Sequence, residues 1–465
     1  MIKKLNRPIK RKLLITTKRV LINFIVLTLF FAISTQVLSL NLGSPEDDSK
    51  NYLLVSSGDS LYKVSDDGKV IKRINLGMEG YFQWGLCLSP DGNRMLFGFN
   101  QSLEFNNRHE SWWVINSDGT GKKDLGKEIG IKYGEYYLPF FSPDGDKILF
   151  QTVFNYQVNV HWRQDAWIIN SDGTGKRNLS KEMEGGFIAY SSFSPDGKKI
   201  IFEWAGITKR TTAQTENLYV WMMTPDGKEK KVISSKNLTE GIYDGIFFGL
   251  PPVFSPDGKK ILIGVKFRID DLKSPISIDV ASIWSIDTEG TVKELVREKR
   301  GPIEWLSFSP DGKKILFAFN RINRIGSVSV YPSIWIMNSD GTEKRNLMGE
   351  MKGKLWDVSF SPDGKKILFG FESGIWTMNS DGTEKRKFAY GFSELSFSPN
   401  GKKILVNSDD YYIMNSDGTK QIKLGKTLGM EIKYAIWYPK LKGTLKAIIN
   451  SIGNARENSL VISIK

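Results

Sequence analysis

Histidine and carboxylate side chains are the residues of this chain that could bind a metal ion. The two histidines, His109 and His161, are 52 residues apart, and a nearby carboxylate could provide a third ligand. They stand four residues before Trp113 and six residues before Trp167, so their positions are not equivalent. We therefore expect no metal site and no cofactor.

The sequence lacks other catalytic motifs. It contains no GxSxG nucleophile elbow, no phosphate-binding P-loop and no HExxH zinc motif. The single cysteine, Cys87, lies in the apolar string 84–88, so we expect a small buried residue rather than a nucleophile. The recurring NSDG sequence resembles the start of a calcium loop but lacks its later acidic ligands, which favours a hairpin turn. We predict a protein that is not an enzyme and that has no nucleic-acid partner.

Aromatic side chains close to carboxylates recur in the segments that lead into one strand of each repeat. Such groups could stack on a sugar or hold a peptide or protein, because the ring supplies apolar contact and the carboxylate accepts hydrogen bonds. The alternative is that they fill loops and protect strand edges. The candidate ligand-binding residues are Trp84, Glu135, Tyr136, Tyr243, Asp244, Glu304, Trp305, Trp356, Asp357 and Glu394.

A repeated strand–turn–strand pattern must position these residues. In FSPDGKKILFAFN, residues 308–320, the proline presets the turn and the aspartate side chain caps it. Gly312 then supplies a positive φ, and an apolar run follows. The turn recurs, in steps of 37 to 61 residues, at Gly92, Gly145, Gly197, Gly258, Gly312, Gly364 and Gly401. A period of this length is typical of a repeat architecture.

A second strand–turn–strand pattern, IWIMNSDGTEKRNL at residues 334–347, alternates with the first. Its turn glycines are Gly68, Gly119, Gly173, Gly227, Gly290, Gly341, Gly382 and Gly418. Each repeat is thus predicted to form four short antiparallel strands, which is typical of a β-propeller blade. One position of the third strand carries a tryptophan that we expect to pack one blade against the next. It is filled by Trp167, Trp221, Trp284, Trp335 and Trp376.

The strand directions place both kinds of turn on one face of the propeller, here the turn face, and the connecting loops on the other, the loop face. Lysine pairs such as Lys313–Lys314 follow the turns and would form a cationic ring. This ring could attract an anionic lipid or polymer. The alternative, which the sequence alone favours, is that the lysines only solvate the hairpin ends and protect the strand edges. The loops of the other face are longer and differ between repeats, so we predict that this face binds.

The first 40 residues are predicted to be a targeting segment. Residues 1–19 contain eight basic residues and no acidic residue, and residues 20–40 are uncharged and just long enough to span a bilayer. We expect a signal peptide or transmembrane signal anchor over residues 1–40, a linker over 41–50 and the propeller over 51–465. Because the basic flank would stay in the cytoplasm, the propeller would be extracytoplasmic: periplasmic, secreted or anchored to the membrane.

The two ends of the chain are predicted to close the propeller by pairing. Eight turns of the second kind but seven of the first are present, so one blade must combine both termini. Its four strands would come from residues 434–439, 444–449, 60–64 and 70–76. Residues 52–55 and 460–464 also have strand patterns, so the prediction is eight blades and the alternative is seven blades with extra terminal strands.

The alternation of FSPDGKKILF with IWIMNSDGTEKRNL resembles the WD-repeat-like β-propeller repeat of the translocation protein TolB, over about residues 51–450. It is also similar to propeller domains of prolyl-oligopeptidase-type peptidases and of oligogalacturonate lyase. The resemblance implies an all-β propeller and no particular activity. TolB has a further N-terminal α/β domain for which this chain has no room, and the peptidases have a hydrolase domain with a serine elbow that is absent here. The lyase uses histidines at a metal, and this chain has two histidines.

The sequence supports two functions of different kinds. We predict a monomeric, non-catalytic propeller scaffold outside the cytoplasm that binds a protein, peptide or glycan through its loop face. The membrane is a further partner if the N-terminal segment stays uncleaved. The alternative is a carbohydrate-active enzyme, a polysaccharide lyase or glycosidase, whose carboxylates or histidines act in the central funnel of the loop face.

Overall fold

The structure is a computed structural model that describes residues 51–439 apart from short gaps. These gaps are residues 102–109, 130–134, 157–160, 182, 184–185, 208–214, 235–243, 271–276, 299–302, 324–328, 350–352, 373 and 391–393. The targeting segment and linker at residues 1–50 therefore lie outside the described residues, as do His109 and Tyr243.

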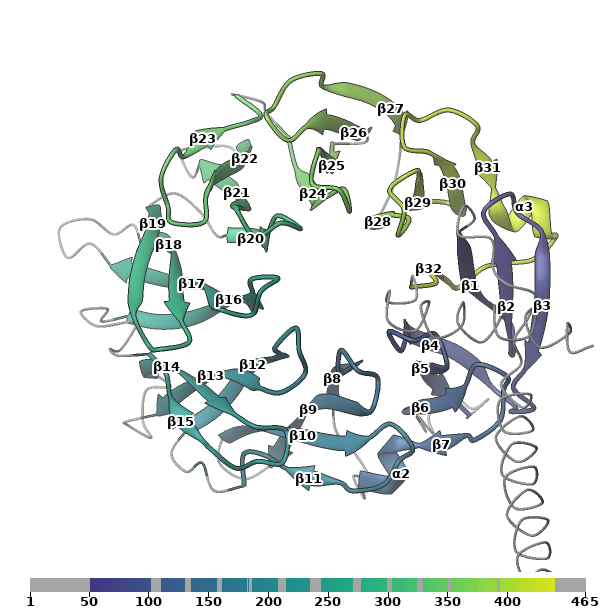
Figure 1. Cartoon of the computed structure of the whole chain (residues 1–465), viewed down its shortest axis with the longest axis horizontal. Coiled ribbons are helices and arrows are strands. Elements are labelled where there is room, and N and C mark those ends of the chain that lie inside the picture. Colours follow the sequence, from purple (N-terminus) through teal and green to yellow (C-terminus); the bar gives the residue numbers. More distant parts are fainter. Residues whose placement is uncertain are drawn as a thin grey trace, which may run out of the picture. The chain divides into compact units, whose positions relative to one another are not determined.

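Eight four-stranded antiparallel sheets surround a common centre as the blades of a β-propeller (Figure 1). This confirms the predicted all-β fold and eight blades rather than seven. Written from the innermost strand outward, blade 1 contains β4 (Tyr81–Leu88), β5 (Arg94–Asn100), β6 (Glu110–Asn116) and β7 (Lys123–Asp124); blade 2 contains β8 (Glu135–Phe141), β9 (Lys147–Tyr156), β10 (His161–Asn170) and β11 (Arg177–Asn178); blade 3 contains β12 (Gly186–Phe193), β13 (Ile200–Ile207), β14 (Thr215–Met223) and β15 (Lys231–Val232); and blade 4 contains β16 (Asp244–Phe254), β17 (Lys260–Asp270), β18 (Ser277–Asp287) and β19 (Val292–Glu298).

In the same order, blade 5 contains β20 (Ile303–Phe308), β21 (Lys314–Asn323), β22 (Ser329–Asn338) and β23 (Arg345–Asn346); blade 6 contains β24 (Leu355–Phe360), β25 (Lys366–Phe371), β26 (Gly374–Asn379) and β27 (Arg386–Tyr390); blade 7 contains β28 (Glu394–Phe397), β29 (Lys403–Asn407), β30 (Tyr411–Asn415) and β31 (Ile422–Lys423); and blade 8 contains β32 (Tyr434–Trp437), β1 (Tyr52–Ser57), β2 (Ser60–Ser65) and β3 (Val70–Asn75). The short helices α2 (Leu125–Ile129) and α3 (Leu424–Leu428) follow β7 and β31. Within the described part of the chain, no helix is long and apolar enough to cross a membrane.

The inner turn, between the first and second strands of a blade, is closed by the hydrogen bonds that its sequence predicts. In blade 5 the Gly312 N–H donates to the Ser309 carbonyl at 2.8 Å, and Gly312 has φ 71°. The Asp311 carboxylate accepts from Ser309 Oγ at 2.6 Å and from the Lys313 N–H at 3.1 Å. These bonds stabilise the charged carboxylate, so the pKa of Asp311 is lowered.

Both kinds of turn lie together on one face, as predicted. In blade 5 the Ser339 N–H of the outer turn donates to the carbonyl of Lys313 in the inner turn at 2.9 Å. The equivalent bond in blade 6 joins the Ser380 N–H to the Lys365 carbonyl at 2.8 Å. The innermost strand of each blade therefore begins at the loop face and ends at the turn face.

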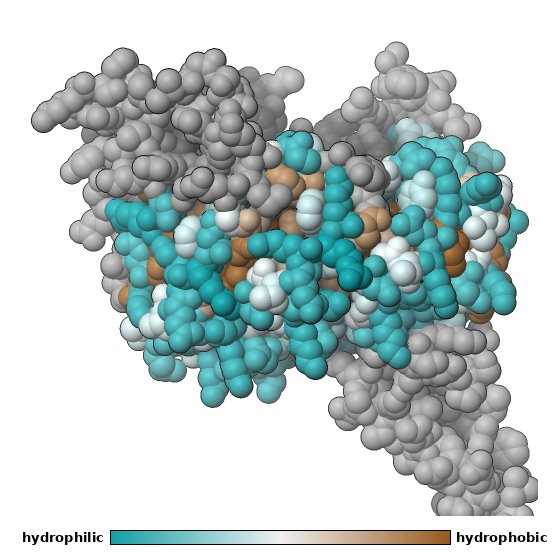
Figure 2. Space-filling model, turned by 90° about the horizontal axis from the view of Figure 1, so that it is seen from above, coloured by the Kyte–Doolittle hydropathy of each residue, from teal (hydrophilic) through white to brown (hydrophobic). Residues whose placement is uncertain are grey.

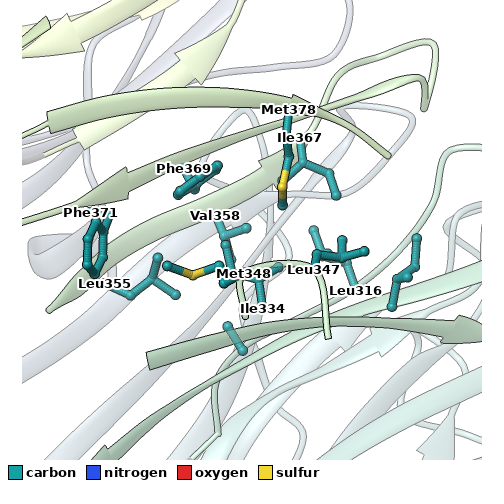
Figure 3. Close-up of a cluster of buried hydrophobic side chains, with 12 residues drawn as sticks. Leu316, Ile334, Leu347, Met348, Leu355, Val358, Ile367, Phe369, Phe371 and Met378 are labelled. Atoms are coloured by element: carbon teal, nitrogen blue, oxygen red, sulfur yellow. The ribbon is translucent and has the colours of Figure 1, made fainter. Parts of the chain in front are cut away.

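The hydrophobic core lies between neighbouring blades. The cluster between blades 5 and 6 interleaves Leu316 and Ile334 from one sheet with Val358 and Ile367 from the next (Figure 3). The third-strand tryptophans pack as predicted, each beside the residue of the second strand that pairs with it. The rings of Trp335 and Phe317 stack at 9° with centroids 6.4 Å apart, and those of Trp376 and Phe369 stack at 15° with centroids 6.1 Å apart. Each stacked pair lies within one sheet, and the tryptophan also packs against the cluster shared with the preceding blade, Trp335 against that of blades 4 and 5 and Trp376 against that of blades 5 and 6.

Blade 8 closes the ring with strands from both termini, as predicted. β32 pairs antiparallel with β1 in a register that places Ile436 opposite Leu54. The prediction was wrong about the second strand, because β1 takes the place assigned to residues 444–449. β1 and β2 are joined by the two-residue turn Gly58–Asp59, so this hairpin forms from adjacent residues and closes a short loop. Residues 444–449 and 460–464 lie outside the described residues.

Candidate functional site

The predicted ligand-binding residues gather at the loop-face ends of the innermost strands. The prediction placed them in loops, but the innermost strands begin earlier than the sequence pattern indicated. β4 carries Trp84, β8 carries Glu135 and Tyr136, β16 begins at Asp244, β20 carries Glu304 and Trp305, β24 carries Trp356 and Asp357, and β28 begins at Glu394. In β4, β20 and β24, strand pairing continues on both sides of a β-bulge, so these strands extend beyond the residues that alternate between apolar and polar.

Strand register brings four of these residues to one level around the ring. Trp84 pairs with Gly98, Trp305 with Ala318, Asp357 with Gly370 and Glu394 with Asn407. In each case the partner is the sixth residue after the glycine of the inner turn, so the four positions are structurally equivalent. We call these equivalent positions the inner level.

The side chains of Trp305 and Asp357 also connect neighbouring blades. Trp305 packs against the hydrophobic cluster between blades 5 and 6. The Leu395 N–H of blade 7 donates to Asp357 Oδ2 of blade 6 at 3.3 Å. Each residue therefore has a structural contact in addition to any contact with a ligand.

Trp356 is the candidate whose side chain is most clearly available. It lies within the β-bulge of β24, between the paired residues Leu355 and Asp357, and it is 44 % exposed. Its indole Nε1–H donates to the carbonyl of Glu372 at 2.8 Å, which fixes the orientation of the ring. The Lys354 ammonium lies 3.8 Å from the ring centroid, so a cation and an aromatic surface are presented together.

The backbone around Trp356 is held in an unusual conformation. Glu372 has φ 54°, and its Oε1 accepts from the Lys354 N–H at 2.7 Å. Gly353 has φ 146°, and a Cβ at this position would lie 2.1 Å from Glu372 Oε1. Glu372 stands in the two-residue turn between β25 and β26, where a positive φ is usual, and both its carboxylate and its carbonyl hold the segment around Trp356. We call Gly353, Lys354, Trp356 and Glu372 the Trp356 platform.

Glu203, which the sequence analysis did not single out, is fully buried in β13. It occupies the sixth position after the inner-turn glycine, where other blades have small residues such as Gly264 and Ala318. Neither carboxylate oxygen has a hydrogen-bond partner among the described residues. Burial away from water therefore raises the pKa of Glu203 well above its usual range. Alignment of the repeats would have revealed this glutamate as an exception.

Tyr81 is a second exposed aromatic residue that the prediction omitted. It is the first residue of β4, at the loop face of blade 1, and it is 44 % exposed. Its hydroxyl accepts a hydrogen bond from Asn100 Nδ2 at 3.1 Å. Its place at the start of the innermost strand was the available signal.

The structure describes the side chain of Cys87 but not those of the two histidines. No group of three metal-ligating side chains occurs in the described residues, but the side chains of His109 and His161 are not among them. Cys87 packs against the cluster between blades 1 and 2, and burial raises the pKa of its thiol. A raised pKa disfavours the reactive thiolate.

Comparison with known proteins yields similar folds rather than a family. No family model and no curated protein sequence matches the chain. An oligogalacturonate lyase from Vibrio parahaemolyticus is 13% identical with a TM-score of 0.46, covering 78% of this chain and 96% of the lyase. The propeller domain of the Trilobed protease from Pyrococcus furiosus is 14% identical with a TM-score of 0.44, covering 74% of this chain and 96% of that domain. A putative TolB from Agrobacterium tumefaciens is 16% identical with a TM-score of 0.34, covering 69% of this chain and 94% of the TolB chain. At this identity no activity transfers to the chain, and the fold assignment depends on its own eight sheets.

Proposed function

We propose that this chain is a non-catalytic β-propeller scaffold that acts outside the cytoplasm and binds a protein, peptide or glycan through its loop face. The observation that carries the proposal is the Trp356 platform. An indole that is fixed by a hydrogen bond and still 44 % exposed offers a large contact area at low entropic cost.

The chemistry of the platform favours a ligand with an apolar face and an acceptor group. The ring would stack on a sugar or pack against a peptide side chain, while Lys354 would donate to a carboxylate or hydroxyl of the ligand. Tyr81 supplies a further exposed aromatic ring on another innermost strand. Aromatic residues on several blades would let one ligand contact more than one blade.

The extracytoplasmic location is part of the proposal and is supported by the sequence. Eight basic residues precede an uncharged apolar stretch at residues 20–40, which is the order of a signal peptide or signal anchor. The single cysteine is consistent with a fold that is held by its core and that needs no disulfide in an oxidising compartment.

Glu203 is the observation that favours the alternative, a carbohydrate-active enzyme. A glycosidase needs a carboxyl group with a raised pKa as its general acid, and burial raises the pKa of Glu203. Glu203 is however fully buried, so a substrate could reach it only if the structure around it opened. The scaffold is therefore the function that we propose.

Affinity capture from envelope extract tests the proposal. The bait is residues 51–465, either unchanged or with the Trp356→Ala substitution. The variant should lose at least about tenfold in affinity, since truncating a well-placed tryptophan costs about 2 kcal/mol or more. Ile71→Ala is the matched control, because Ile71 is 56 % exposed on the outer strand β3. Equal capture by both variants would contradict the platform, and cleavage of an added polysaccharide would favour the enzyme.

A further inference from the structure

Five lysines at equivalent positions follow the inner turns of blades 3 to 7. All five side chains are exposed, and none forms an ion pair or side-chain hydrogen bond among the described residues. They are Lys198, Lys259, Lys313, Lys365 and Lys402. We call this set the lysine arc.

The inner turns hold the lysine arc in a fixed geometry. The backbone N–H of Lys313 donates to Asp311 Oδ1 at 3.1 Å, and that of Lys365 donates to Asp363 Oδ1 at the same distance. In blades 3 to 6 the turn aspartate accepts hydrogen bonds from its own serine and from the lysine backbone, and in blade 7 Asn400 takes its place. The ammonium groups form no ion pair among the described residues and are exposed to solvent. An outer turn such as that of blade 5 carries a second acid, Glu343, in addition to its turn aspartate Asp340.

Neighbouring inner turns adjoin one another, so the arc is continuous. A Cβ built on Gly312 would lie 3.3 Å from Cδ of Pro256 in the preceding blade, and the same distance separates Gly364 from Pro310. The corresponding distance from Gly401 to Pro362 is 3.5 Å. Five cations therefore line one side of the inner rim on the turn face.

The polypeptide enters the propeller on this same face. The Asn51 carbonyl accepts from the Asp66 N–H at 3.0 Å, and Asn51 Nδ2 donates to Asp66 Oδ2 at 3.0 Å. Asp66 belongs to the outer turn of blade 8, so residue 51 lies at the turn face. Residues 41–50 connect it to the apolar stretch and span at most about 36 Å when fully extended.

We propose that the turn face docks on an anionic phospholipid surface through the lysine arc. The proposal concerns a surface opposite the loop face, so either proposal can fail while the other stands. Lysine ammonium groups near an anionic bilayer are attracted to the lipid phosphates, and the attraction adds up over several residues. Contact through headgroups rather than insertion is expected because the arc consists of exposed lysines and not of apolar side chains. The side of the propeller that Figure 2 shows is likewise mostly hydrophilic over its described surface.

Vesicle sedimentation of residues 51–465 tests the arc without the N-terminal segment. This part contains all strands of the eight sheets, from Tyr52 to Trp437, and therefore the whole closed ring. The body should bind phosphatidylcholine vesicles that contain phosphatidylglycerol and should not bind phosphatidylcholine alone. Replacing the five lysines of the arc by glutamine should lower binding by at least roughly tenfold.

A charge-matched variant is the control. It replaces five exposed lysines on the outer parts of the blades by glutamine, at Lys72, Lys127, Lys181, Lys387 and Lys426. This variant should keep most of the binding. Equal loss in both variants, equal binding to both kinds of vesicle, or binding to soluble polyphosphate without binding to vesicles would each overturn the proposal.

Amine acylation of the full chain in the same vesicles tests the orientation. Phosphatidylglycerol should slow acylation of the arc lysines severalfold, while the five control lysines react as they do in phosphatidylcholine. Unprotected arc lysines would overturn the proposal even if the chain is membrane-bound, because binding would then depend on the N-terminal segment alone.

Discussion

Replacing Glu203 by glutamine should make the stability of the propeller less sensitive to pH. The carboxyl is fully buried and has no hydrogen-bond partner among the described residues, so its charged form has lost hydration without compensation. Glutamine has nearly the same size and cannot ionise. The substitution therefore removes the cost of the charge and leaves the packing around this side chain almost unchanged.

The magnitude follows from proton linkage. The pKa of Glu203 is raised in the folded chain, so the folded state keeps a proton that an unfolded glutamate releases above about pH 4.3. The stabilising contribution of the neutral carboxyl is thus fully present below that pH and is lost as the pH rises through the raised pKa. Within this window one proton changes the free energy of unfolding by about 1.4 kcal/mol per pH unit.

Thermal melting from pH 4 to pH 8 measures the effect. An unfolding entropy of about 2.1 cal/mol/K per residue over roughly 390 residues gives about 1 °C in Tm for each kcal/mol. The Tm advantage of Glu203→Gln should therefore grow by about 1.7 °C per pH unit between about pH 5 and the raised pKa of Glu203. The exposed Glu343→Gln is the control for a substitution at the surface. A Tm difference that stays constant with pH would refute the reasoning, because it would mean that the Glu203 carboxylate is solvated or paired.

Two further predictions concern the repeat and its closure. Gly312→Val should destabilise the propeller by roughly 1–3 kcal/mol, because a β-branched residue is forced to φ 71° with its Cβ 3.3 Å from Pro256. Gly264→Ala is the control in the same melting assay and should be tolerated, because its added Cβ would lie no closer than 3.6 Å to any neighbour. A chain that ends at residue 433 should aggregate or lose its cooperative melt, since β1 becomes an open edge, and a chain that ends at Pro439 is the comparator that retains β32. Equal melting of the two members of either pair would contradict the turn or the closure.

The turns and the number of blades were predictable from the sequence because they depend on local chemistry. The SPDG turn uses a proline, a capping aspartate and a glycine with positive φ, and each makes its contacts within six residues. The closure was predictable only in part. Hydrophobic patterns offered more strands than blade 8 could hold, and the choice of β1 depends on its pairing with β32, about 380 residues away.

The candidate site was predictable in composition but not in the role of each side chain. Trp356 and Asp357 are adjacent in sequence, yet the bulge of β24 exposes the first and directs the second to the backbone of blade 7. A bulge depends on the partner strand, so the separation of these two residues is visible only in three dimensions. Glu203 differs, because an alignment of the repeats identifies it from sequence. Only the structure shows that its carboxylate has no hydrogen-bond partner among the described residues.

The two faces of the propeller differ in how much their sequences can change. The inner turns are closed by a serine, an aspartate (Asn400 in blade 7) and a glycine, so replacement of one residue disturbs several hydrogen bonds. The loop-face ends of the innermost strands carry different residues in each blade, including Trp84, Trp305 and Glu394 at a single level. A face with similar turns and with lysines on five of its blades is suited to a uniform partner such as a lipid surface. A variable face is suited to a ligand with one specific shape, so the two proposed surfaces follow from the same repeat.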